Sequence, residues 1–168
     1  ALQAVGVAAV AKDRPGQPFV LCSVGDGGTQ QGDFYEAVAE AVRAHLPVFF
    51  LIEDNRFALS TPTKGQTFYS LPGGEAESFY GLPVRRIDGT DAAGACGAFE
   101  NAVAQLRETR GPQIAVFNCE RLESHTNADD QTVYRSADEL RQALESADPC
   151  AKLRARLRAD GIGESRLR

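Results

Sequence analysis

The sequence predicts an α/β fold in which a mostly parallel, twisted sheet carries helices on both faces. Two apolar runs, at residues 19–24 and 47–52, are continuous rather than alternating, which is typical of strands covered on both sides. Between them lie a glycine-rich segment and a stretch with apolar residues at helical spacing, the order of a βαβ unit. We expect a single domain over residues 1–168, a length sufficient for one sizeable core.

The individual elements follow from local signals along the chain. A continuous apolar run predicts a strand, and apolar positions three or four residues apart predict a helix. In order, we expect a helix at 1–12, a strand at 19–24, a glycine-rich loop at 25–32, a helix at 33–45, a strand at 47–52, an irregular crossing loop at 55–82, a strand at 84–87, a helix after Asp91, a strand at 113–119, a polar loop at 120–135 and two C-terminal helices within 136–168.

Capping residues mark where the later helices begin. Asp91 can accept hydrogen bonds from the first amides of its helix, and Ser136 with Glu139 forms a capping box. Asp148 before Pro149 starts the last helix. The residues expected on inward faces are Cys96, Phe99, Val103 and Leu106 in the helix after Asp91, and Leu153 and Leu157 in the helix that Gly161 ends.

Composition excludes several classes of function. A net charge of −5 and a pI of about 5.1 argue against general attraction to nucleic acid, and no apolar stretch is long enough to span a membrane. Cys22, Cys96 and Cys119 are expected to be small buried hydrophobes in a reducing compartment. We therefore expect a cytoplasmic protein, or one of the mitochondrial matrix in a eukaryote.

The segment Gly25–Gly32 offers three interpretations as a phosphate-binding loop. A dinucleotide fingerprint requires glycine three positions after Gly27, where Gln30 stands, and a Walker loop requires lysine after Gly32, where Asp33 stands. What remains is a strand ending in Gly-Asp-Gly, which places a carboxylate at the edge where open parallel sheets bind ligands.

A carboxylate beside a diphosphate requires a cation between them. Mg²⁺ takes oxygen ligands and usually shares them with phosphate. A second oxygen ligand should come from the end of the next strand, where the sequence has Glu53-Asp54-Asn55. Glycine amides in the loop can approach phosphate oxygens, because no side chain stands in the way.

These motifs carry a resemblance to a known family. Gly-Asp-Gly followed 29 positions later by Asn55 is similar to the thiamine diphosphate motif. The segments 25–37, 53–63, 87–91 and 121–130 resemble the alpha subunit of the decarboxylating component of 2-oxo acid dehydrogenase complexes, and the resemblance runs from about Ala4 to Leu157. It implies a thiamine-diphosphate-binding fold with thiamine diphosphate and Mg²⁺ as cofactors.

The resemblance also implies roles for particular residues. Asp26 and Asn55 would supply side-chain oxygens to Mg²⁺, and Phe57 its backbone carbonyl. Gly25, Gly27 and Gly28 would lie against the diphosphate. The family often has Asn at the position of Asp54, and this departure leaves the metal oxygen of Asn55 in place.

Histidines occur twice, and their contexts differ. His45 ends a helix, where interaction with the helix dipole explains it. His125 lies in the polar loop at 120–135, which the resemblance places at the active-site entrance. There His125 would contact the substrate carboxylate or assist acyl transfer, and the residues bracing the loop would be Arg121, Asp129 and Tyr134.

The implied reaction is oxidative decarboxylation of a 2-oxo acid with acyl transfer to a lipoyl domain. The implied partners are a beta subunit in an α2β2 assembly, a lipoyl-bearing acyltransferase and the N-terminal portion of the alpha subunit. The chain has no methionine and opens on an apolar helix pattern without a basic leader, so we expect a fragment of a longer subunit. Acetoin dehydrogenase and a non-catalytic module for cofactor binding or assembly remain alternatives.

Overall fold

A five-stranded sheet forms the centre of the computed structural model, which describes residues 1–167. The strand order is β1-β2-β9-β8-β7. Four strands are parallel, and the short β7 is antiparallel to β8. Their bounds are β1 Val20–Gly25, β2 Val48–Asp54, β7 Ser78–Phe79, β8 Leu82–Asp88 and β9 Gln113–Asn118. The predicted α/β class and the mostly parallel sheet are confirmed.

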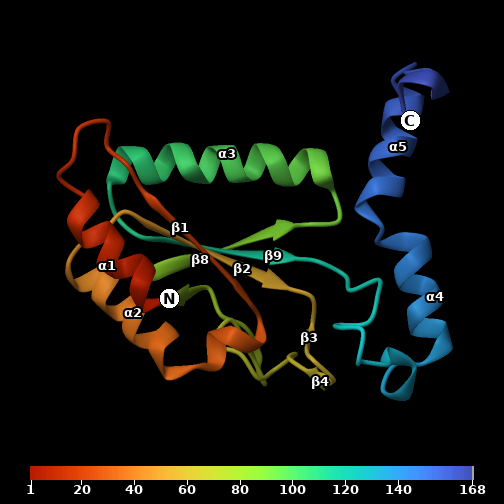
Figure 1. Cartoon of the computed structure of the whole chain (residues 1–168), viewed down its shortest axis with the longest axis horizontal. Helices are drawn as coiled ribbons and strands as arrows, with labels where there is room; N and C mark the ends of the chain where they lie inside the picture. The colour runs from red at the N-terminus through yellow and green to blue at the C-terminus, as the bar shows by residue number, and fades with distance from the viewer. Residues whose placement is uncertain (168) are drawn as a thin grey trace.

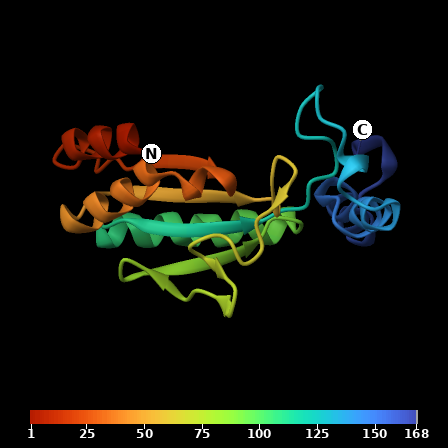
Figure 2. The same cartoon turned by 90° about the horizontal axis from the view of Figure 1, so that it is seen from below.

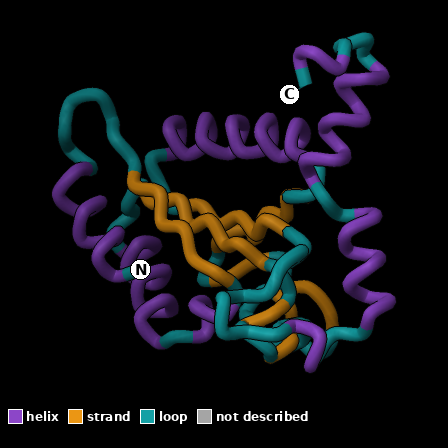
Figure 3. The backbone as a smooth tube through the Cα atoms, turned by 45° about the vertical axis from the view of Figure 1, so that its right-hand side comes forward, coloured by secondary structure: helices purple, strands orange, loops and turns teal. Residues whose placement is uncertain are grey.

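Helices cover both faces of this sheet, as predicted. Helices α1 (Leu2–Ala11) and α2 (Gly32–Arg43) lie on one side, and α3 (Ala92–Thr109) lies on the other (Figures 1 and 3). The side chains of β2 alternate between the two layers: Phe50 joins the cluster under α1 and α2, whereas Phe49 joins the cluster under α3. Burial on both faces is why these strands are continuously apolar in the sequence.

The last part of the chain lies beyond the carboxyl ends of the strands. Helices α4 (Ala137–Ser146) and α5 (Pro149–Ala159) stand at the end of the molecule toward which the long strands run (Figures 1 and 2). The short helices η2 (Gln131–Val133) and η3 (Glu164–Arg166) flank them. The predicted caps at Asp91, Ser136 and Asp148 are all confirmed by side-chain hydrogen bonds to first-turn amides.

The segment expected to be an irregular crossing loop is more regular than predicted. It contains two small hairpins and then β7, which extends the sheet; the hairpin strands are β3 Phe57–Ala58 with β4 Thr61–Pro62, and β5 Ser70–Leu71 with β6 Gly74–Glu75. Arg86 of β8 fixes the second hairpin, because its guanidinium donates to the carbonyls of Tyr69 and Ala76 at 2.7 and 3.2 Å. Two-residue strands are too short to leave a periodic pattern in the sequence.

One further expectation is corrected by the structure. Cys96 was predicted on the inner stripe of α3 but is exposed, because Ala95, Phe99 and Ala102 form the face that meets the sheet. His45 follows the C-terminus of α2, as predicted from the sequence, and its Nε2 also lies 3.0 Å from the carbonyl oxygen of Thr109, the last residue of α3. Leu153 and Leu157 of α5 are only half-buried.

Among the described residues, no helix has both the length and the hydropathy needed to cross a membrane.

Candidate functional site

The carboxyl ends of β1 and β2 bring the two predicted ligand segments together. Gly25 of β1 is in register with Glu53 of β2, and the next amide, that of Asp26, donates to the Glu53 carbonyl at 3.2 Å. Asp26 and the Glu53-Asp54-Asn55 segment therefore share one edge of the sheet, the edge at which open parallel sheets bind ligands.

The Asp26 carboxylate is held inside this edge. Asp26 is only 3% exposed; its Oδ1 accepts from the Gly27 amide at 2.8 Å and its Oδ2 from the Thr63 hydroxyl at 3.2 Å. Thr29, fully buried, donates to the Asp26 carbonyl at 2.6 Å. The short helix η1 (Gly27–Gln30), which Asp26 caps, thus fixes both the backbone and the side chain of Asp26.

A second carboxylate faces the first. Burial raises the pKa of the Asp26 carboxyl, and the neighbouring Asp54 carboxylate raises it further. Within residues 1–167, neither Asp26 nor Asp54 forms an ion pair with a basic side chain. Two nearby carboxylates without a positive partner make a cation at this place favourable.

Asn55 and Phe57 lie in a tight turn immediately after β2. The Asn55 Oδ1 accepts from the Phe57 amide at 3.1 Å, and the Asp54 Oδ1 accepts from the Arg56 amide at 2.8 Å. Arg56 has a φ of 70°, a conformation that is unfavourable for a residue with a side chain. The hydrogen bonds to the side chains of Asp54 and Asn55 stabilise the turn in this conformation. In the described residues no hydrogen bond joins Asn55 to Asp26. Both lie at the same edge of the sheet.

The loop glycines differ in how closely other atoms approach them. A Cβ at Gly27 would lie 2.7 Å from the Ala58 Cβ, and one at Gly28 would lie 2.7 Å from a methyl group of Val24, whereas nothing lies within 4 Å at Gly25. The absence of side chains at Gly27 and Gly28 therefore lets η1 sit directly against β1 and β3. A side chain at position 25 would have room, so close packing does not require glycine there.

Gly27→Ala should destabilise the protein by about 1–3 kcal/mol, because the new methyl group must displace Ala58 and with it β3. Gly32→Ala is the matched control: it lies in the same sequence segment at the first position of α2, with no atom within 4 Å of its Cβ position. Its stability should change by less than about 0.5 kcal/mol. Urea unfolding of both variants measures the difference, and equal midpoints would contradict the close approach.

The predicted histidine loop is anchored by the residues expected to brace it. Arg121 donates to the carbonyl of Leu59 at 2.7 Å and to the hydroxyl of Tyr134 at 2.6 Å. The Asp129 Oδ2 accepts from that hydroxyl at 2.6 Å and from the His125 amide at 2.8 Å, and these hydrogen bonds lower the pKa of the Asp129 carboxyl. Arg121 thereby ties the loop to the turn that follows Asn55, while His125 itself is exposed.

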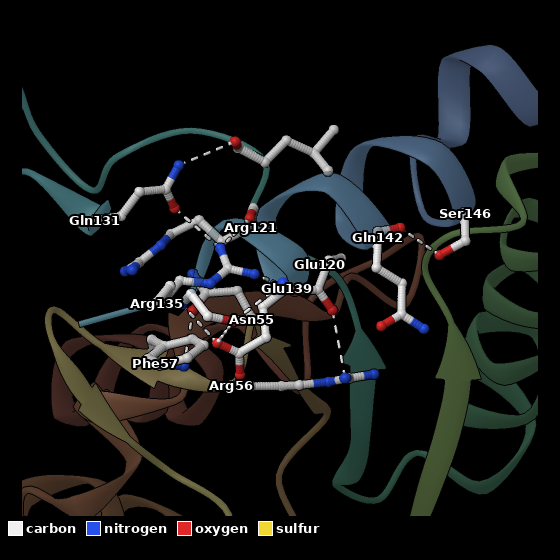
Figure 4. A network of polar contacts seen from close by, with 12 residues as sticks. Asn55, Arg56, Phe57, Glu120, Arg121, Gln131, Arg135, Glu139, Gln142 and Ser146 are labelled. Atoms are coloured by element: carbon white, nitrogen blue, oxygen red, sulfur yellow. Dashed lines mark hydrogen bonds and ion pairs between the residues drawn. The ribbon is translucent and has the colours of Figure 1, made fainter. Parts of the chain in front are cut away.

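Arg135 is a second anchor, at a position that no sequence pattern had indicated. Its guanidinium donates to the Arg121 carbonyl at 2.6 Å, to Gln131 Oε1 at 2.9 Å and to Glu120 Oε1 at 2.8 Å (Figure 4). The guanidinium carbons of Arg121 and Arg135 each lie 5.1 Å from the centre of the Phe57 ring, within the range of cation–π attraction. Phe57, two residues after Asn55 and itself predicted to offer its carbonyl to the metal, therefore contacts both anchors of the histidine loop.

Comparison with known proteins identifies the family. The sequence model described as "Dehydrogenase E1 component" matches residues 1–166. The chain belongs to the dehydrogenase E1 component family. This E1 chain is 33% identical over 166 residues to the 3-methyl-2-oxobutanoate dehydrogenase subunit alpha of Mycobacterium tuberculosis. It is 35% identical over 162 residues to pyruvate dehydrogenase E1 component alpha subunits of Staphylococcus aureus and Staphylococcus epidermidis.

These matches cover nearly all of this chain but less than half of each relative. The aligned region is 99% of the chain and 45% of the mycobacterial relative, and 96% of the chain and 43% of the staphylococcal ones. The resemblance to 2-oxo acid dehydrogenase alpha subunits expected from the sequence is confirmed, and the chain corresponds to a part of such a subunit.

Proposed function

We propose that this E1 chain binds thiamine diphosphate through Mg²⁺ and serves in the oxidative decarboxylation of a 2-oxo acid. The observation that carries the proposal is the buried Asp26 carboxylate, which faces Asp54 at the ligand-binding edge of the sheet without a basic partner in the described residues. The names of the relatives, a pyruvate and a 3-methyl-2-oxobutanoate dehydrogenase, support 2-oxo acids as the substrate class over acetoin.

The residues present fit a divalent cation that shares its ligands with a diphosphate. In residues 1–167 no group of three or more His, Cys, Asp and Glu side chains could hold a metal ion, so a cation needs amide, carbonyl and ligand oxygens to complete its coordination. Mg²⁺ is commonly bound in this way, by one or two carboxylates together with phosphate oxygens. Asp26, the side chain of Asn55 and the carbonyl of Phe57 would hold it.

The chain contributes position and charge to the reaction. Gly27 and Gly28 let η1 pack directly against β1 and β3, and the backbone amides held there would bind the diphosphate. Thiamine diphosphate supplies the electron sink that allows the bond to the carboxylate carbon to break. His125, exposed on its anchored loop, would hydrogen-bond the substrate carboxylate or assist acyl transfer to a lipoyl group. A beta subunit and a lipoyl-bearing acyltransferase would complete the assembly.

The metal dependence of cofactor binding tests this function. Calorimetry on the complete protein should detect thiamine diphosphate binding with Mg²⁺ and little without it. Asp26→Asn should bind the cofactor weakly whether or not Mg²⁺ is present. Asp138→Asn is the control, since Asp138 is an exposed carboxylate on α4. Equal affinity of wild type and Asp26→Asn in the presence of Mg²⁺ would remove Asp26 from the site and refute the proposal.

A further inference from the structure

The hydroxyl of Tyr69 is a buried donor without an acceptor. Tyr69 is 1% exposed, and its hydroxyl forms no hydrogen bond with the described residues. Burial raises the pKa of Tyr69 above its usual range. A buried polar group that lacks a partner costs about 1–3 kcal/mol, so an acceptor oxygen brought to this position by a ligand would be stabilised.

Asp54 belongs to the same cavity as Tyr69. Asp54, Thr63 and Tyr69 line a cavity of about 1020 Å³ at the carboxyl end of the sheet. Thr63 also donates to Asp26, so Asp26 lies directly behind the cavity wall. One oxygen of Asp54 accepts from the Arg56 amide at 2.8 Å, and this bond leaves the other oxygen free for a ligand.

We propose that Asp54 is a further ligand of the cation beside Asp26, Asn55 and the Phe57 carbonyl, so that two carboxylates hold it, and that the Tyr69 hydroxyl donates to an oxygen of the diphosphate that this cation carries. The inference rests on the proposed function and deepens it. A bridging cation removes the repulsion between the two carboxylates, and a phosphate oxygen gives Tyr69 its missing acceptor.

The second carboxylate increases the affinity of the site for a divalent cation. A ligand set with two carboxylates has one more negative charge than a set with Asp26 and Asn55 alone, and affinity for hard cations rises with the charge of the ligands. The chain therefore places the Asp54 carboxylate against the cation, where a neutral amide would give only a dipole.

Binding of Mn²⁺ alone to the complete protein, followed by electron paramagnetic resonance, tests the role of Asp54. Asp54→Asn keeps the Oδ1 that accepts from Arg56, and Asp54→Ser offers a hydroxyl for the same turn. Both variants should bind Mn²⁺ on the order of tenfold or more weakly. Asp54→Asn should also raise the melting temperature of the metal-free protein, because one of two repelling charges is gone. Asp138→Asn, at an exposed carboxylate of α4 that does not line the cavity, should leave Mn²⁺ binding unchanged.

Inorganic pyrophosphate tests the role of Tyr69. Tyr69→Phe should bind Mn²⁺ alone normally but bind pyrophosphate in the presence of Mn²⁺ several times more weakly. If Asp54→Asn and Asp54→Ser bind Mn²⁺ like wild type while Asp26→Asn does not, the role of Asp54 as a cation ligand is refuted and the proposed function stands. If Tyr69→Phe binds pyrophosphate like wild type, the donor role of Tyr69 is refuted. If wild type binds neither Mn²⁺ nor thiamine diphosphate, the proposed function fails as well.

Discussion

Arg135→Met should lower the free energy of unfolding by about 3–5 kcal/mol, the usual cost of removing one partner from a buried ion pair. The Arg135 side chain is 3% exposed and that of its partner Glu120 is 12% exposed, so methionine would leave Glu120 inside the protein with only the exposed Arg56, 3.4 Å away. The change also removes the donors to the Arg121 carbonyl and to Gln131. Chemical unfolding measures the loss.

Two control variants separate burial from charge. Arg141→Met removes an exposed pair with Asp138 on α4, and its effect should be below about 0.5 kcal/mol. Replacing Glu120 and Arg135 together by glutamine should cost less than Arg135→Met alone, because no uncompensated charge remains. If Arg135→Met and Arg141→Met destabilised the protein equally, the anchoring role of Arg135 would be wrong.

His125→Ala should lower turnover of the complete complex by on the order of a hundredfold or more while leaving cofactor affinity unchanged. Loss of one positioned proton donor or acceptor has this effect. The ring of His125 makes no hydrogen bond within the described part of the chain, and its backbone amide, which an alanine keeps, is the group that binds Asp129. Stability should therefore change by less than about 0.5 kcal/mol.

Thr126→Ala is the control for this experiment, since Thr126 is the exposed neighbour of His125 on the same loop. It should retain turnover. Steady-state rates with a 2-oxo acid and calorimetry with thiamine diphosphate give the two readouts. Normal turnover in His125→Ala would remove His125 from the chemistry and leave only the site around Asp26.

Much of the fold could be predicted from the sequence, because its signals are local. The continuous apolar runs predicted β1 and β2, and the capping residues Asp91 and Ser136 predicted helix starts that the structure confirms. Cys96 was misplaced because a helix rich in alanine has several nearly equivalent apolar faces, and the one that packs is decided by Phe49 and Ile87 of the sheet.

The candidate site was predictable only where its residues lie at strand ends. Asp26 and Asn55 follow β1 and β2 directly, so their shared position at one edge is a consequence of parallel pairing. Thr63 and Tyr69 come from the segment expected to be irregular, and Thr63 meets Asp26 across 37 positions of sequence. The two hairpins bring them there, the second of them fixed by Arg86, and no local pattern shows that.

The position of β9 in the sheet has a consequence for how the site is assembled. Along the chain β2 and β8 both precede β9, but in the sheet β9 lies between them. Without β9, no strand pairing joins the half of the sheet with β1 and β2 to the half with β7 and β8. Pairings between distant segments form slowly, since the intervening chain must first be closed into a loop. Insertion of residues 113–118 joins the halves, and with them the walls that enclose Asp54 and Tyr69.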